Sequence, residues 1–169
     1  MINERLTDAI NDQINFELYS EYLYLSMQAY FQKINLLGFA NWMSVQVQEE
    51  RAHAMGLYNY LIERNGEIEL ECITKPNTNW ESTLEVFEET LKHEQLVTGR
   101  IDSIMNIAEE EKDRAALSFL QWYIKEQVEE EANASAILQT LKMIKDDPNA
   151  LLLLDKDLAT RTFVAPVIG

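Results

Sequence analysis

The sequence predicts an all-α fold, a bundle of four long helices followed by a short fifth one. Nearly half of the residues are apolar, and the 169 residues include only five glycines and three prolines. Over long stretches the apolar residues recur at the three-, four- and seven-residue spacing of one helix face. A chain of this length can bury a substantial core. It shows no internal repeat or low-complexity stretch, so we expect residues 1–169 to form a single domain.

The first part of the chain predicts two helices, over about residues 3–32 and 38–64. The core-facing row of the first helix, at seven-residue spacing, is Ile10, Glu17, Tyr24 and Phe31. The second helix has two such rows, one through Glu50 and one through His53, and an Asn-Gly pair ends it. Because the connection between the two helices is short, they should be antiparallel neighbours.

The longest connection covers about residues 66–80, contains a proline and lacks helical periodicity. Such a length can carry the chain from one end of a bundle to the other. Two more long helices are expected over about residues 82–111 and 113–145, and a short one over about 148–159. The last helix starts at Asp147-Pro148, because an acid at the cap and a proline at the first helical position favour initiation.

The formal net charge of −15 argues against nucleic acid and anionic membranes as partners and fits cationic ones, although solubility explains the same charge. The single Cys72 cannot form an internal disulfide and suits a reducing compartment. The chain does not open with an apolar segment like a signal peptide, and the run Leu151–Leu154 is too short to span a bilayer. We therefore expect a cytoplasmic protein.

In each of the four long helices, a polar residue interrupts one core-facing row near its middle. These residues are Glu17 in the first helix, Glu50 and His53 in the second, Glu94 in the third, and Gln127 and Glu130 in the fourth. Mid-helix positions of neighbouring helices meet at one level, where four carboxylates would repel one another and resist ionisation. Their four negative charges match two divalent cations. The pattern predicts a dinuclear iron or manganese centre, with Glu50 placed to bridge the two metals.

Any one of these interruptions is more commonly an ordinary polar residue of the core, and Glu50-x-x-His53 arises by chance in acidic helices. Four aligned interruptions argue against that explanation for the whole set, and a structural or signalling bundle without metal is the alternative. That alternative predicts no gain in stability on adding metal and no relief of repulsion in Glu50→Ala. A carboxylate cluster predicts both.

Over nearly its whole length the sequence resembles the bacterial non-haem ferritins, on segments 15–20, 48–53, 92–96, 119–123 and 126–131. The resemblance implies a ferritin-like four-helix bundle with a short fifth helix. It also implies a first iron site made by Glu17, Glu50 and His53. Glu94 and Glu130 would complete a second site, with Glu50 bridging the two irons. Gln127 would be an outer or weak ligand beside the pair.

The resemblance also implies a third iron site, made by Glu49, Glu126 and Glu129 on the side toward a cavity. Tyr24 resembles a family tyrosine that is hydrogen-bonded at the centre, while core packing explains this position equally well. The implied function is iron storage by a ferroxidase, an enzyme that oxidises Fe(II) to Fe(III) with O2 or peroxide. The product would be a ferric oxyhydroxide mineral inside a hollow homo-oligomeric shell of 24 subunits, with the leucine run of the fifth helix buried at the four-fold axes.

Departures from related families narrow this expectation. In bacterioferritins a haem-binding methionine follows the second-helix glutamate, whereas this chain has Arg51 there and Met55 a turn away, so we expect no haem. DNA-protecting mini-ferritins usually lack a fifth helix and often have a basic tail, the opposite of this chain. A rubrerythrin-like peroxidase needs paired cysteines, which Cys72 alone cannot supply. An oxygenase on the same bundle remains an alternative, which turnover of an organic substrate would reveal.

Three further features bear on the centre and its access. The fourth helix has Gln127-x-x-Glu130 in place of a second E-x-x-H motif, as ferritins do, which speaks against a permanently occupied redox centre. His93 adjoins Glu94 but points about 100° away on a helix, so we expect it beside the centre or at the surface, not as a ligand. The run 109–111 should be a solvated helix end, and an iron-entry role near a three-fold pore is the weaker alternative.

Overall fold

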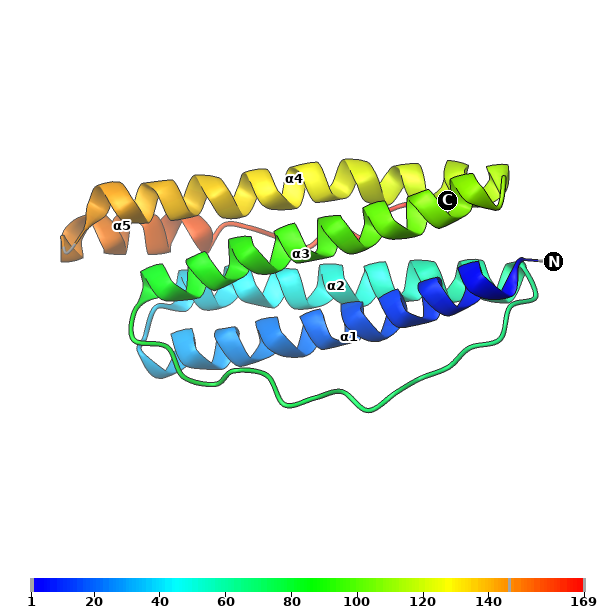
Figure 1. Cartoon of the computed structure of the whole chain (residues 1–169). Helices are drawn as coiled ribbons and strands as arrows, with labels where there is room; N and C mark the ends of the chain where they lie inside the picture. Colours follow the sequence, from blue (N-terminus) through cyan, green and yellow to red (C-terminus); the bar gives the residue numbers. More distant parts are fainter. Residues whose placement is uncertain (1, 146, 169) are drawn as a thin grey trace.

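The computed structural model describes residues 2–145 and 147–168, and it confirms the all-helical fold class (Figure 1). The helices of these residues are α1 (Glu4–Lys33), α2 (Leu37–Glu63), α3 (Thr83–Glu110), α4 (Arg114–Ile144) and α5 (Pro148–Leu158). Each begins and ends within one residue of the position expected from the sequence. None of the helices in the described ranges combines the length and the apolar character needed to cross a membrane.

The four long helices form two antiparallel pairs, α1 with α2 and α3 with α4, and the pairs pack against each other (Figure 1). The segment 64–82 joins them and runs along the outside of α1 from one end of the bundle to the other. Two asparagines of α1 hold this crossover through its backbone. Asn11 bonds the carbonyl of Glu67 at 2.8 Å and the amide of Glu69 at 3.0 Å, and Asn15 bonds the carbonyl of Glu69 at 2.8 Å.

The first turn of α2 is capped by a side chain from the other end of the sequence. The remaining helices begin at their own capping side chains, which are Asn3, Ser82, Asp113 and Asp147. Leu36 at the start of α2 makes no such bond. Instead, Asp155 of α5 accepts hydrogen bonds from the amides of Gly38 at 2.8 Å and Phe39 at 3.0 Å. A Cβ atom at Gly38 would lie 1.5 Å from the carbonyl oxygen of Asp155, so this close approach requires glycine.

The core consists of two apolar clusters separated by a polar region. The α5-end cluster includes Phe31, Phe39, Phe87 and Leu158. The N-terminal cluster, at the other end of the bundle, includes Leu6, Leu57, Ile101 and Leu120. Between them lie six buried polar side chains, which we call the polar layer: Glu17, Glu50, His53, Glu94, Gln127 and Glu130. The fold therefore puts the residues that interrupt the apolar rows at one level of the bundle.

After α5 the chain turns back and runs along the bundle between α2 and α4 (Figure 1). We call residues 161–168 the C-terminal strap. They are extended, and partly buried side chains such as Arg161 and Phe163 alternate with exposed ones such as Thr162 and Val164. The sequence does not indicate where this segment lies.

Candidate metal centre

The polar layer puts six side chains with ligand atoms in the middle of the bundle, shielded from solvent. Their exposed fractions lie between 1% and 4%. All four long helices contribute to the layer. Each of these side chains stands in a row that buries apolar residues one or two turns away. The amphipathic pattern that forms the core thus also buries the carboxylates.

Two groups of three side chains bring their ligand atoms together. Atoms of Glu17, Glu50 and His53 lie within 4.8 Å of one another, and so do atoms of His53, Glu126 and Glu130. Glu50 and His53 lie one turn apart on α2, with Oε2 of Glu50 3.8 Å from Nδ1 of His53. Oxygen and nitrogen ligands lie about 2.0–2.2 Å from a transition metal, so separations of this size suit atoms that share one ion. The first group matches the first iron site expected from the sequence.

Four polar atoms in this region lack a hydrogen-bond partner among the described residues. They are Oε2 of Glu17, Oε2 of Glu50, Nε2 of His53 and Oε1 of Gln46. Buried polar atoms in proteins nearly always have a partner, because an unsatisfied one costs about 1–3 kcal/mol. A cation between Glu17 and Glu50 would satisfy both carboxylate oxygens. Nε2 of His53 lies 3.9 Å from Oε1 of Glu126 and is open to an ion on that side of the ring.

Burial raises the pKa of every carboxyl group in the polar layer. It is the largest cause for Glu17, Glu50 and Glu130, and the pKa values of Glu50 and Glu130 rise well above the usual range. The negative charges of neighbouring glutamates raise the pKa of Glu50 further. Burial raises the pKa of Glu94 to about 7, against the effect of its hydrogen bonds. Without a cation these groups tend to hold protons, and a divalent cation would displace them.

His53 is the imidazole of the layer, and burial lowers its pKa to about 4. The ring is therefore neutral near pH 7 and has a lone pair for a metal. It meets Trp122 edge-on, with ring centroids 5.5 Å apart. The hydroxyl of Tyr123 donates to the backbone carbonyl of His53 at 2.9 Å. These contacts hold this turn of α2 against α4.

Glu94 is held from two sides by hydrogen bonds. The hydroxyl of Tyr24 donates to its Oε1, and Nε2 of Gln127 donates to its Oε2 at 3.2 Å. The sequence left the role of Tyr24 open between packing and hydrogen bonding, and the structure shows the hydrogen bond in addition to complete burial. Both donors stabilise the ionised form of Glu94.

Residues outside the predicted set fix two more carboxylates. Nε2 of Gln13 donates to Oε1 of Glu17 at 2.8 Å, and Oε1 of Gln13 accepts from Nε of Arg100 at 2.9 Å. In the same way Nε2 of Gln46 donates to Oε2 of Glu130 at 3.0 Å. The sequence analysis did not assign these roles. Their signal was present, because each glutamine is a further polar residue on a core-facing helix position, one turn or less from the level of the layer.

A third group of carboxylates lies beside the polar layer and closer to solvent. Glu49 and Glu126 are partly buried and Glu129 is exposed. Burial raises the pKa of Glu49, and the charges of Glu126 and Glu129 raise it further. Nη2 of Arg161 lies 2.7 Å from Oε2 of Glu49, and Oε1 of Glu126 lies 3.9 Å from Nε2 of His53. The structure therefore brings the residues of the expected third site near each other and adds a cationic partner that the sequence analysis did not identify.

Comparison with known proteins establishes the family. A family model described as a ferritin-like domain matches residues 7–144. A bacterial non-heme ferritin of Staphylococcus aureus (strain MRSA252) is 42% identical over 163 residues, covering 96% of this chain and 98% of the relative. The chain belongs to the ferritin family. A second bacterial non-heme ferritin, from Bacteroides fragilis (strain 638R), is 42% identical over 161 residues, 95% of this chain and all of that relative.

Solved ferritin structures share the whole fold. A humanized archaeal ferritin superimposes with a TM-score of 0.96 at 51% identity, over 97% of this chain and 99% of that one. An open-pore ferritin from the hyperthermophilic archaeon Archaeoglobus fulgidus gives a TM-score of 0.94 at 49% identity, over 95% and 98%. The resemblance seen in the sequence is confirmed. Family and fold together support iron storage, and the polar layer contains carboxylate and histidine groups that could hold a metal ion.

His93 adjoins a candidate ligand of this ferritin, and it is buried, with an exposed fraction of 6%. Its Nε2 lies 2.8 Å from Oγ of Ser20, and its ring stacks on Phe16 with centroids 5.3 Å apart. Of the two places expected for His93, the structure shows the one beside the centre, because α1 covers this side of α3. His93 packs beside the polar layer, and its neighbours include Tyr24.

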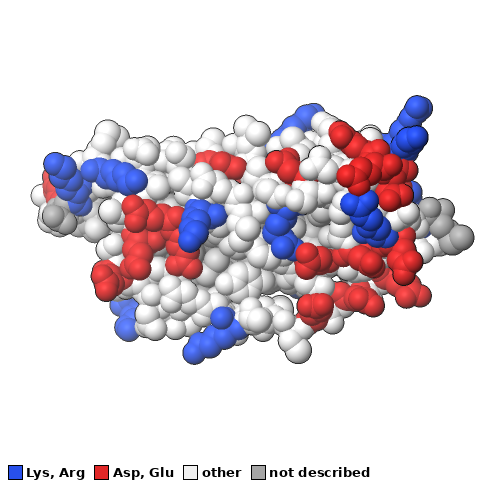
Figure 2. Space-filling view, in the orientation of Figure 1, with Lys and Arg blue, Asp and Glu red and all other residues white. Residues whose placement is uncertain are grey.

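Acidic side chains of this ferritin gather where α3 meets α4, at the end of the bundle opposite α5 (Figure 2). Glu110 pairs with Arg5 at 2.6 Å, and Glu111 lies 3.7 Å from the same guanidinium and accepts from Asn3 at 2.9 Å. All three residues of the run 109–111 are exposed. These contacts are those of a solvated helix end that also ties α3 to the start of α1.

Proposed function

We propose that this ferritin is a ferroxidase that oxidises Fe(II) at the polar layer and stores the product as a ferric oxyhydroxide mineral. One observation carries the proposal. Four buried carboxylates and one neutral imidazole, from four different helices, share one level of the bundle, and several of their ligand atoms have no partner in the described residues. Such an arrangement is costly without cations and is the ligand set of dinuclear carboxylate centres.

In this proposal Fe(II) is the substrate, and each side chain has a defined role. Glu17 and His53 hold one iron, Glu94 and Glu130 hold the other, and Glu50 lies between the two. Gln127 is a weak ligand or an outer contact, and Tyr24 orients Glu94 by its hydrogen bond. Glu49, Glu126 and Glu129 form a third site nearer to solvent, which receives or passes on iron.

The chemistry follows from the ligands. Carboxylates are hard anionic ligands and stabilise Fe(III) relative to Fe(II), which favours oxidation. Two Fe(II) ions each give one electron to O2, which takes up two protons and leaves as hydrogen peroxide. With peroxide as oxidant, the same two electrons and two protons yield two molecules of water. Hydrolysis of each Fe(III) by two waters then gives FeOOH and releases three protons.

The mineral needs an enclosure, and we infer a homo-oligomeric shell of 24 subunits in the cytoplasm. The leucine run of α5 supports assembly, because Leu152 and Leu153 are 52% and 68% exposed in the single chain. Val128 and Met143 on α4 are 71% and 75% exposed as well. Apolar side chains this exposed are typical of surfaces that contact another subunit.

Aerobic oxidation of two Fe(II) per subunit, followed by rapid mixing and an oxygen electrode, tests the proposal. We expect a fast phase that consumes O2, and a loss of about 100-fold or more in its rate constant in Glu50→Ala, because that variant removes the carboxylate between the irons. Glu4→Ala is the matched control, since this glutamate is exposed in the first turn of α1, thirteen residues before Glu17. An unchanged fast phase in Glu50→Ala would show that the ligand assignment is wrong.

Size-exclusion chromatography of the same preparations tests the storage shell. The proposal expects a large assembly that retains added iron at its elution volume. Elution as a monomer or dimer with iron in the low-molecular-weight fraction would contradict storage.

The alternative of a bundle without metal is disfavoured by the unpartnered atoms. In such a bundle each buried polar atom should have a hydrogen-bond partner. Four buried polar atoms among the described residues have none.

A further inference from the structure

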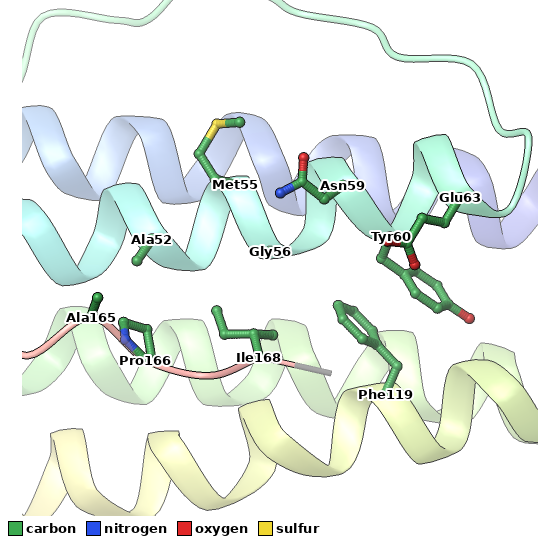
Figure 3. A pocket seen from close by; sticks show the side chains of 10 residues that line it. All are labelled: Ala52, Met55, Gly56, Asn59, Tyr60, Glu63, Phe119, Ala165, Pro166 and Ile168. Atoms are coloured by element: carbon green, nitrogen blue, oxygen red, sulfur yellow. The ribbon is translucent and has the colours of Figure 1, made fainter.

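The C-terminal strap is fitted into the bundle beside the third group of carboxylates. Pro166 and Ile168 lie between α2 and α4 and face Gly56 (Figure 3). A Cβ atom at Gly56 would come within 2.8 Å of Cδ1 of Ile168 and 2.5 Å of the Tyr123 hydroxyl. The strap can therefore lie this close to α2 only because residue 56 has no side chain.

Arg161 is fixed by several contacts with α2. Its Nη2 bonds Oε2 of Glu49 at 2.7 Å, and its Nη1 donates to the carbonyl of Trp42 at 3.4 Å. The guanidinium carbon lies 4.6 Å from the centre of the Trp42 ring, a cation–π contact. Its own carbonyl accepts from Nδ2 of Asn41 at 2.9 Å. The side chains of Arg161 and Glu49 are only 21% and 19% exposed, so this is a partly buried ion pair.

The guanidinium is bonded to Glu49, one of the three carboxylates that would bind the third iron. The positive charge of Arg161 lowers the pKa of Glu49, and the negative charges of Glu126 and Glu129 raise it. The charge of Arg161 also reaches Glu130 of the polar layer and lowers its pKa, against the larger effect of burial. Arg161 thus partly offsets the negative charge around Glu49 and Glu130.

We propose that the guanidinium of Arg161 occupies the Glu49 position of the third site, so that a metal ion binds there only by displacing it, and that Arg161 thereby sets the affinity of this site. The inference rests on the third site of the proposed function and deepens it. A metal ion at Oε2 of Glu49 would stand next to the positive guanidinium 2.7 Å from that oxygen, so the two cations compete for the same carboxylate. The strap therefore makes the third site weaker than its three carboxylates alone would be. Metal ions should therefore bind the third site after the polar layer is occupied, and dissociate from the third site first.

Calorimetric titration of the assembled apo-protein with Zn(II) tests this inference, because Zn(II) binds nitrogen and oxygen ligands without redox chemistry. In the wild type we expect a tight class of sites from the polar layer and a weaker third class. Arg161→Gln should tighten the third class about five- to tenfold, the range for loss of one partly buried competing ion pair. The tight class should stay unchanged. Arg161→Lys keeps the charge and should stay within about twofold of the wild type.

Two further variants make the test specific. Arg51→Gln removes the same charge from an exposed residue of α2 that lies 3.5 Å from Glu21, outside the third group, and should leave the third class unchanged. Glu49→Gln should weaken the third class and make it insensitive to Arg161→Gln. A third class that Arg161→Gln does not tighten, or that is absent in every variant, overturns the inference while leaving the tight class as support for the di-iron centre. Loss of the tight class in the wild type would instead refute the proposed function.

Discussion

The polar layer and the α5-end cluster are built from the same helix faces but differ in what those faces bury. On α1, Glu17 and Phe31 are both core residues, with exposed fractions of 1% and 0%. Phe31 stacks on Phe39 with centroids 5.1 Å apart, whereas one oxygen of Glu17 has no bonding partner in the described residues. One helical pattern thus produces an apolar region that stabilises the bundle and a polar region whose buried carboxylates cost stability. The apolar ends of the bundle offset that cost.

The largest effect on stability is expected from the apolar side of this comparison. Phe87 is fully buried in the α5-end cluster, with its ring 5.3 Å from Trp42 and 5.8 Å from Phe39. Phe87→Ala should lower the free energy of unfolding by about 3–5 kcal/mol, because it leaves a cavity. Chemical denaturation of the metal-free protein measures the change. Zn(II) stoichiometry at the polar layer should be retained, and a loss below about 1 kcal/mol would contradict the role given to this cluster.

The polar side of the comparison should show in the pH dependence of stability. Folding raises the pKa of Glu94 to about 7 from an ordinary 4.5, so the folded protein keeps a proton that the unfolded chain loses. The resulting stabilisation is complete below about pH 4.5 and is lost as the pH rises toward 7. His53, with its pKa lowered to about 4, has the opposite effect and loses stability as the pH falls from about 6.5 to 4. The pH dependence of stability measured on the wild type alone therefore combines the contributions of Glu94 and His53.

Comparison with Glu94→Gln isolates the carboxyl group. The free energy of unfolding of the variant minus that of the metal-free wild type should be larger at pH 7 than at pH 5, by on the order of 1–3 kcal/mol. The reason is that the amide of the variant does not ionise, whereas Glu94 of the wild type does. Denaturant titrations at several pH values in the presence of a chelator provide the measurement. A stability difference that does not vary with pH would show that Glu94 titrates normally. Saturating Zn(II) should stabilise the wild type more than the variant.

A smaller effect is expected from the glutamine that orients Glu17. Gln13→Met keeps the size of the side chain but removes both its bond to Glu17 and its bond to Arg100. Outer partners of this kind typically contribute about 10–100-fold to metal affinity, and we expect the low end, about tenfold, because Glu17 itself remains. Zn(II) calorimetry measures it, with Gln121→Met on the exposed face of α4 as the matched control. Equal affinities in the two variants would contradict an orienting role.

Most of the fold could be predicted from the sequence, because long amphipathic helices have a periodic signal and marked ends. The Asn-Gly stop after α2 has the expected geometry, with Asn65 at a positive φ of 56° and the amide of Gly66 bonded to the carbonyl of Leu61 at 2.8 Å. The meeting of the polar residues at one level followed from their mid-helix positions. Their assignment as iron ligands stays a prediction, which the experiments on Glu50 test.

The C-terminal strap and its contacts could not be predicted in the same way. An extended segment of eight residues has no helical period, so nothing in its sequence selects the groove between α2 and α4. The pairing of Arg161 with Glu49 joins positions 112 residues apart, and neither residue alone indicates the other. Gly56 gave only an indirect sign, since a glycine within a helix often permits a close approach of another segment.

The cap that Asp155 provides for α2 has a consequence for the order in which the molecule is completed. Asp155 bonds the amide of Gly38 across 117 positions of sequence, and a ribosome makes α5 long after α2. Before α5 has been made, the first amides of α2 can bond only to water, and α5 does not yet cover that end of the nascent bundle. A truncated translation product that stops before residue 155 would therefore differ from the finished subunit at the very end where α5 lies, and cellular quality control could distinguish the two there.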